Sequence, residues 1–269
     1  MNDHYRTFFG FTKEPFANDI DSKQILKTPE LSEVKVRFDY VTRLGAIGIV
    51  TGEVGSGKST AVRYAIDALH PSEYKALYIT ASSGSIMEFY RQLKDALDIY
   101  LSSNSKVVLV KNIKKEIVNL VLEKKQKVVL IVDEASLMRL EVFAELHTIC
   151  QFEKDAKPWL PIILVGQISL VDKLTFRSSQ PLASRVIAKC HLEGVDLDGM
   201  QTYLRHHLAI AGIERNLFDE QAVMAIHQGS GGLFRKANHL ARGGLIAAAA
   251  QKADVVSAEH IRLAATEIF

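Results

Sequence analysis

The stretch of sequence that decides the fold is a run of eight residues: Gly52, Glu53, Val54, Gly55, Ser56, Gly57, Lys58 and Ser59. The run fits the phosphate-binding-loop pattern G-x-x-x-x-G-K-[ST]. Its glycines let the backbone wrap tightly, so that several N–H groups point at one anion. Lys58 is expected to reach the β- and γ-phosphates of ATP, and the Ser59 hydroxyl to hold Mg²⁺. Thr60 completes the predicted nucleotide-binding residues.

The sequence around this loop alternates between apolar runs and helical periodicity. Five apolar runs are expected to form strands: 46–51, 76–80, 128–132, 162–165 and 186–190. Helical spacing appears between them at 58–69, 85–98 and 105–123. This alternation predicts an α/β fold of the P-loop NTPase type, a parallel five-stranded sheet flanked by helices.

Beyond Gly194 the pattern becomes wholly helical. Four helices are expected there: 196–211, 218–228, 232–250 and 257–268. We therefore expect an N-terminal segment and helix at 1–45, an α/β nucleotide-binding domain at 46–194 and a helical lid at 195–269. A cluster of phenylalanines between Phe8 and Phe16 indicates that the N-terminal segment docks on the main domain, and Pro29 is a plausible helix start.

Composition adds few constraints. The chain has 269 residues, 48% of them hydrophobic, and a net charge of +2, so its overall charge indicates no particular partner. Cys150 and Cys190 belong to no CxxC pair, which favours two free thiols in a reducing compartment. The N-terminus shows no secretion leader, and no apolar stretch reaches the roughly 20 residues of a membrane span. These features predict a cytoplasmic protein without a membrane segment.

A second motif lies 75 residues after Lys58, where an apolar strand ends in Asp133 and Glu134. Buried strands rarely end in two carboxylates without a reason, because an unpaired buried charge is costly. Asp133 is placed to hold Mg²⁺, and Glu134 to orient and polarise the attacking water. The alternative is that the two acids are simply solvated at the end of a strand. The phosphate loop favours the metal-binding interpretation, because a Mg²⁺–ATP site needs both motifs.

The order of these motifs resembles that of AAA+ ATPases, and more narrowly that of the ExeA-like ATPases, of the general secretion pathway protein A type, with their transposon-borne relatives. The matching stretches cover most of the chain: 9–16, 51–60, 129–135, 164–167, 182–186 and 229–238. The aromatic N-terminal segment and the lid motif at 229–238 carry the narrower resemblance.

The resemblance implies roles for three further residues and offers a fourth as a weaker candidate for one of these roles. Gln167 looks like a sensor that contacts the γ-phosphate or the attacking water. Arg185 looks like an arginine finger that reaches a neighbouring subunit, with Arg177 as a weaker candidate, and Arg235 looks like a lid sensor of the nucleotide. A finger in trans implies a homo-oligomer, either a ring or a helical filament. One departure is Phe234, which stands where relatives usually carry proline, so the aim of Arg235 is less firmly set.

The sequence leaves open which functional class of ATPase this is and which partner it acts on. One is a transposition helper similar in kind to TniB, TnsC, MuB and IstB, which bind duplex DNA non-specifically and recruit a transposase. The alternative is a cytoplasmic ATPase of a secretion or envelope-assembly system with a protein partner; an adaptor in signalling or defence is more remote. The chain ends at Phe269 without the membrane span of longer secretion-type relatives, which favours the transposition helper.

A local excess of lysine bears on the same choice. Residues 106–127 contain seven lysines against two acids. Lys106, Lys111, Lys114 and Lys115 are the candidate DNA contacts, because lysine–phosphate contacts carry no sequence information. A solvated helix face is the competing explanation for such a run.

Overall fold

The structure is a computed structural model that describes residues 4–17, 19–103 and 105–268. The chain divides into two compact units. An α/β unit contains residues 28–52 and 58–192, and a helical unit contains the described residues up to Lys27, the short segment 53–57 and the chain from Glu193 onward.

The α/β unit is built on one five-stranded sheet with the strand order β2-β3-β4-β1-β5. Its strands are β1 (Ile47–Gly52), β2 (Tyr74–Thr80), β3 (Lys127–Asp133), β4 (Ile162–Gly166) and β5 (Val186–Leu192). Every pair of neighbours is parallel, which confirms the predicted sheet. Because the strands are parallel, the carboxyl ends of β1, β3 and β4 lie along the same edge of the sheet.

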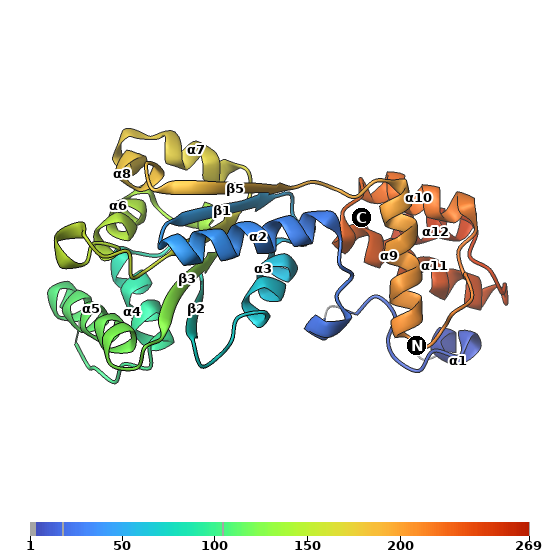
Figure 1. The fold of residues 1–269 in the computed structure, drawn as a ribbon. Coiled ribbons are helices and arrows are strands. Elements are labelled where there is room, and N and C mark those ends of the chain that lie inside the picture. The colour runs from blue at the N-terminus through green and yellow to red at the C-terminus, as the bar shows by residue number, and fades with distance from the viewer. Residues whose placement is uncertain (1–3, 18, 104, 269) are drawn as a thin grey trace. The chain divides into compact units, whose positions relative to one another are not determined.

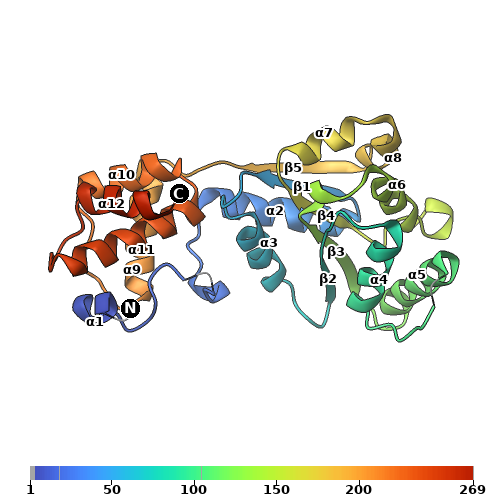
Figure 2. The same cartoon turned by 180° about the vertical axis from the view of Figure 1, so that it is seen from behind.

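Helices cover both faces of this sheet (Figures 1 and 2). On one face, α2 (Pro29–Leu44) packs against α3 (Lys58–Asp67). On the other lie α4 (Ile86–Ala96), α5 (Lys106–Leu122) and α6 (Leu140–Ile149). The short helices α7 (Ser169–Thr175) and α8 (Gln180–Ala183) connect β4 to β5. The Thr28 side chain accepts a hydrogen bond from the Leu31 backbone N–H at the start of α2, as expected for a helix that begins with proline.

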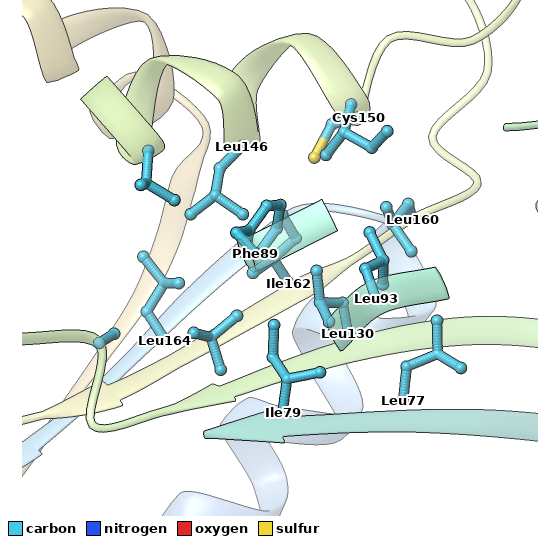
Figure 3. Packing of buried hydrophobic residues seen from close by; sticks show 14 of the residues in the cluster. Leu77, Ile79, Phe89, Leu93, Leu130, Leu146, Cys150, Leu160, Ile162 and Leu164 are labelled. Atoms are coloured by element: carbon cyan, nitrogen blue, oxygen red, sulfur yellow. The ribbon is translucent and has the colours of Figure 1, made fainter. Parts of the chain in front are cut away.

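Successive side chains of a strand point to opposite faces of the sheet, so every second residue contacts the same layer of helices. Leu77, Leu130 and Ile162 point to the face covered by α4 and α6, where Phe89 and Leu146 pack on them (Figure 3). Burying each such side chain contributes roughly 1.5–3 kcal/mol. Cys150 lies in the same layer as a free thiol, and burial raises its pKa to about 12. Since the thiol stays protonated at neutral pH, it is unreactive.

The helical unit consists of α1 (His4–Phe9) and four longer helices, α9 (Leu197–Ile210), α10 (Glu220–Ser230), α11 (Phe234–Ala250) and α12 (Ala258–Ile268). Aspartates cap two of them: Asp196 accepts a hydrogen bond from Gly199 N, and Asp219 from Ala222 N. The short 3₁₀ turn Ser22–Gln24 belongs to the same unit.

The N-terminal aromatic segment packs in the core of the helical unit rather than on the α/β unit. Phe9, Phe11 and Phe16 are buried there, and the Phe16 ring stacks on His207 with 5.3 Å between centroids. The Arg242 guanidinium donates to the Phe16 carbonyl at 2.7 Å. The clustered phenylalanines correctly indicated burial, but the sequence pattern does not specify the surface that receives them.

Among the residues that the structure describes, no helix combines the length and the apolar character needed to cross a bilayer.

We predict that the helical unit loses stability as the pH falls from about 6.5 toward 4. Burial, together with the charge of neighbouring His206, lowers the pKa of His207 from 6.5 to about 4. The unfolded chain therefore binds a proton in this window that the folded unit does not, which costs up to about 3 kcal/mol at the acid end. Hydrogen exchange of α9 as a function of pH measures the effect.

His207→Phe keeps the ring stack and removes the proton-binding group, so its exchange rates should change less over this pH window. His70→Phe, at an exposed position, is the matched control and should behave like the unaltered chain. An identical pH dependence in His207→Phe and in the unaltered chain would contradict the prediction.

Candidate nucleotide-binding site

The predicted phosphate loop connects the end of β1 to the first turn of α3. Gly52 ends the strand and Lys58 begins the helix, which is the strand–loop–helix context that the motif requires. Lys58 is 7% exposed, and its Nζ donates to the Gly52 carbonyl at 2.9 Å. The ammonium group is thus held at the start of α3, where the helix dipole also favours an anion.

The loop backbone requires glycine at two positions. Gly55 has a φ of +88° and Gly57 a φ of +93°, in the region that L-residues rarely adopt. Between them, the Ser56 Oγ is buried and has no hydrogen-bond partner among the described residues. An unsatisfied buried hydroxyl on a positive-φ loop fits a segment that is shaped for a polar ligand such as phosphate.

Arg235 lies beside this loop within the helical unit. Its backbone N–H donates to the Gly55 carbonyl at 3.3 Å, and a Cβ at Gly55 would lie only 2.8 Å from the Arg235 Cβ. The Phe234 ring packs near Gly57 and lies 4.5 Å from the Tyr203 ring. The aromatic contacts of Phe234 therefore hold the start of α11 beside Gly57 and Tyr203.

The carboxylate of Asp133, at the end of β3, accepts hydrogen bonds on both oxygens. Ser59 Oγ donates to Oδ2 at 2.9 Å, and the Glu134 backbone N–H donates to Oδ1 at 2.8 Å. A hydroxyl next to a carboxylate is a donor set that Mg²⁺ favours. The contact brings together the two residues that the sequence predicted as metal ligands.

Tyr78 is a residue of the site that the sequence analysis missed. Its hydroxyl donates to the same Asp133 Oδ2 that receives Ser59. Burial and this hydrogen bond raise the pKa of the phenol, so Tyr78 is a permanent donor at neutral pH. Tyr78 reaches Asp133 because β2 is the neighbour of β3, in a register that pairs Tyr78 with Ile131.

Glu134 has an unusual backbone conformation. Its φ is +53°, in the left-handed region, which costs a residue with a Cβ about 1–2 kcal/mol. Its carboxylate has no hydrogen-bond donor among the described residues. Strained non-glycine residues concentrate at functional sites, and the unpaired carboxylate leaves its oxygens available to water.

Gln167 directly follows β4, the strand between β3 and β1. Its side chain is exposed, and its backbone N–H donates to Ser136 Oγ at 3.4 Å. The strand order therefore places Gln167 at the same edge of the sheet as Gly52 and Asp133.

Arg185 lies at the opposite edge. Its carbonyl accepts a hydrogen bond from Ile47 N, at the amino end of β1, whereas the phosphate loop leaves the carboxyl end of that strand. Six residues of strand span roughly 17 Å. The guanidinium pairs with Asp155, on the side of the sheet away from Lys58, and lowers the pKa of that carboxyl.

Comparison with known proteins agrees with this geometry. The family model described as an AAA domain matches residues 42–174. A general secretion pathway protein A of Aeromonas hydrophila is 28% identical over 265 residues, 98% of this chain. The α/β unit is therefore similar to an AAA domain and has the fold of the P-loop NTPases. The chain spans 48% of the length of that curated relative.

Solved structures share the fold of the chain at low sequence identity. Cdc6p of Pyrobaculum aerophilum has a TM-score of 0.73 at 13% identity, with 94% of this chain and 70% of that chain covered. The ORC2 protein of Aeropyrum pernix, solved as ADPNP–ADP complexes, gives 0.69 at 16% identity, with 94% and 70% covered. The ORC1 protein of the same organism, solved with DNA, gives 0.69 at 14% identity, with 94% and 68% covered.

The four lysines that the sequence predicts as DNA contacts have different surroundings in the structure. Lys106 forms an ion pair with Glu145, and Lys114 donates to the carbonyls of Thr148 and Gln151. Burial lowers the pKa of Lys114. Lys111 and Lys115, four residues apart and so on one face of α5, are exposed and form no ion pair among the described residues.

Proposed function

We propose that this ATPase binds Mg²⁺–ATP through the loop at residues 52–60 and hydrolyses it with Asp133, Glu134 and Gln167. The observation that carries the proposal is the hydrogen bond of 2.9 Å between Ser59 Oγ and Asp133 Oδ2. It joins the first turn of α3 to the end of β3, the two places that a magnesium-bound triphosphate requires.

Each residue has a separate task in this proposal. Lys58 donates to the β- and γ-phosphate oxygens, and the N–H groups of the loop donate to the phosphates. Ser59 and Asp133 hold Mg²⁺, which neutralises charge that develops on the phosphates. Glu134 accepts a hydrogen bond from the attacking water, and Gln167 orients that water or the γ-phosphate. Arg235 reports the nucleotide state from the lid.

Glu134→Gln is expected to keep ATP affinity within about twofold and to lower kcat by about 100-fold or more, because an amide cannot polarise water as a carboxylate does. Steady-state hydrolysis and equilibrium binding of ATP measure the two quantities. Glu141→Gln, at an exposed position on α6, is the matched control. Normal turnover in Glu134→Gln would remove Glu134 from the mechanism.

We further propose that Arg185 completes the site of a neighbouring copy. The sheet separates Arg185 from the phosphate loop of its own chain, so its guanidinium serves hydrolysis only across a subunit contact. An arginine supplied in trans stabilises the charge on the transferred phosphoryl group. The functional unit is therefore a homo-oligomer with a head-to-tail contact.

A mixing experiment tests the arginine in trans. Arg185→Ala alone is expected to lose turnover by about 10³-fold while it still binds ATP. Lys58→Ala alone loses ATP binding. Mixed together, the two variants should regain hydrolysis, because an intact loop in one copy meets an intact Arg185 in the next. A mixture as inactive as its components would overturn the proposal.

Duplex DNA is the partner that we propose for the oligomer, as part of a transposition helper that recruits a transposase. Lys111 and Lys115 present two charges on one helix face that have no ion-pair partner among the described residues, and an oligomer repeats them in every copy. Contacts of this kind bind the phosphate backbone without reading sequence. The DNA complex of the similarly folded Aeropyrum pernix ORC1 protein is consistent with this choice.

The alternative is a secretion or envelope-assembly ATPase with a protein partner. Its support is the name of the curated relative, general secretion pathway protein A, which aligns with 98% of this chain. In that case the same ATP chemistry would act on a protein, and the exposed lysines of α5 would be a solvated surface.

A salt series separates these alternatives. The protein with a non-hydrolysable ATP analogue is titrated with two duplexes of unrelated sequence. We expect equal affinity for both, which falls steeply as salt rises. The double substitution Lys111→Glu and Lys115→Glu should weaken binding, whereas Lys189→Glu, an exposed lysine on β5, should not. No binding even at low salt would favour the protein-partner alternative.

A further inference from the structure

The turn that follows Glu134 leaves two of its carbonyls without a partner inside the turn. The chain continues from Glu134 into a 3₁₀ turn, Ala135–Leu137, and on to Met138. Within the turn, Leu137 N donates to the Glu134 carbonyl at 2.8 Å, and Met138 N to the Ala135 carbonyl at 3.2 Å. Ser136 and Met138 are buried, so their carbonyls need a donor from elsewhere.

Lys173, on α7, supplies that donor. Its Nζ lies 2.5 Å from the Ser136 carbonyl oxygen and 2.6 Å from that of Met138. Hydrogen bonds from an ammonium group are stronger than neutral ones. Among the described residues, Lys173 forms no ion pair with a carboxylate, and the hydrogen bonds of its ammonium group are both to the turn.

The same turn is also held from β4. The Gln167 backbone N–H donates to Ser136 Oγ, and the end of β4 approaches so closely that a Cβ at Gly166 would lie 2.9 Å from Ser136 N. Since α7 begins two residues after Gln167, one continuous segment contacts both sides of the turn. Glu134 and Gln167 are thereby fixed to one another through Ser136.

We propose that Lys173 is a positioning residue for ATP hydrolysis. Its two hydrogen bonds hold the turn that keeps Glu134 at positive φ, and so they set the direction of the Glu134 carboxylate toward the attacking water. Lys173 acts through Glu134 and touches neither the phosphates nor the water. The assignment rests on the proposed role of Glu134, and it adds a residue that neither motif of the nucleotide site contains.

The expected signature is a loss of turnover without a loss of nucleotide affinity. Lys173→Met is expected to lower kcat by about 100-fold, since displacing a reacting group by about 1 Å has an effect of that size. The KM for ATP should stay within about twofold. Lys173→Arg keeps a cation that can donate to both carbonyls and should recover at least about a tenth of kcat. Lys189→Met is the control for loss of an exposed lysine.

A binding measurement separates positioning from a merely structural role. Affinities for ADP with beryllium fluoride, which resembles the bound phosphate, and with aluminium fluoride, which resembles the transferring phosphoryl group, are compared in each variant. Lys173→Met should bind the first normally and the second more weakly. Equal weakening of both, or loss of ADP affinity, would show that Lys173 only maintains the fold and would overturn the proposal.

The double variant with Glu134→Gln completes the test. Because Lys173 acts through Glu134, adding Lys173→Met to Glu134→Gln should lower kcat little further. A further drop of about 100-fold would overturn the assignment of Lys173. Normal turnover in Glu134→Gln would instead overturn the proposed role of Glu134, and the assignment of Lys173 with it. Impaired Glu134→Gln with normal Lys173→Met would overturn the assignment of Lys173 alone.

Discussion

The hydrogen bond between Ser59 and Asp133 is the constraint that the rest of the α/β unit satisfies. Ser59 follows β1 and Asp133 ends β3, with β4 between these strands. The two side chains meet because all three strands run in the same direction and end at the same level of the sheet. Buried apolar strands, covered by helices on both faces, provide that alignment, because a shifted register would move the side chains off their layers. The core therefore determines the geometry of two polar atoms at its edge.

The carboxyl edge of the sheet also shows how a nearly buried acid is accommodated. Asp133 receives donors from α3, from β2 through Tyr78, and from the backbone of Glu134. Three donors thus compensate the two oxygens for the hydration that burial removes. Within the part of the chain that the structure describes, Glu134, one residue later, receives no such donor, and its backbone is strained. Two adjacent carboxylates thus have opposite environments, which suits one for holding a cation and the other for contact with water.

Local patterns predicted the parts of the molecule that local chemistry determines. The phosphate loop, the Asp133–Glu134 pair and the apolar strands are contiguous in sequence, so their residue types and spacing were enough. Tyr78 and Lys173 could not be found in this way, because strand order and a helix packed behind a turn bring them to the site. The same holds for Lys106 and Lys114, whose partners on and just after α6 lie more than thirty residues away. The N-terminal phenylalanines indicated burial but not the surface against which they pack.

The placement of Arg185 at the edge of the sheet away from the phosphate loop gives each molecule a direction. In the head-to-tail assembly that we propose, every internal copy both receives an arginine and supplies one. In a closed ring every copy receives an arginine, whereas an open filament has one terminal copy that receives no arginine. If Arg185 acts in trans as proposed, that copy would hydrolyse its nucleotide most slowly and would act as a cap on one end. The filament would then be a polar polymer. Its length would depend on how fast copies add at the slowly hydrolysing end and how fast internal copies hydrolyse ATP.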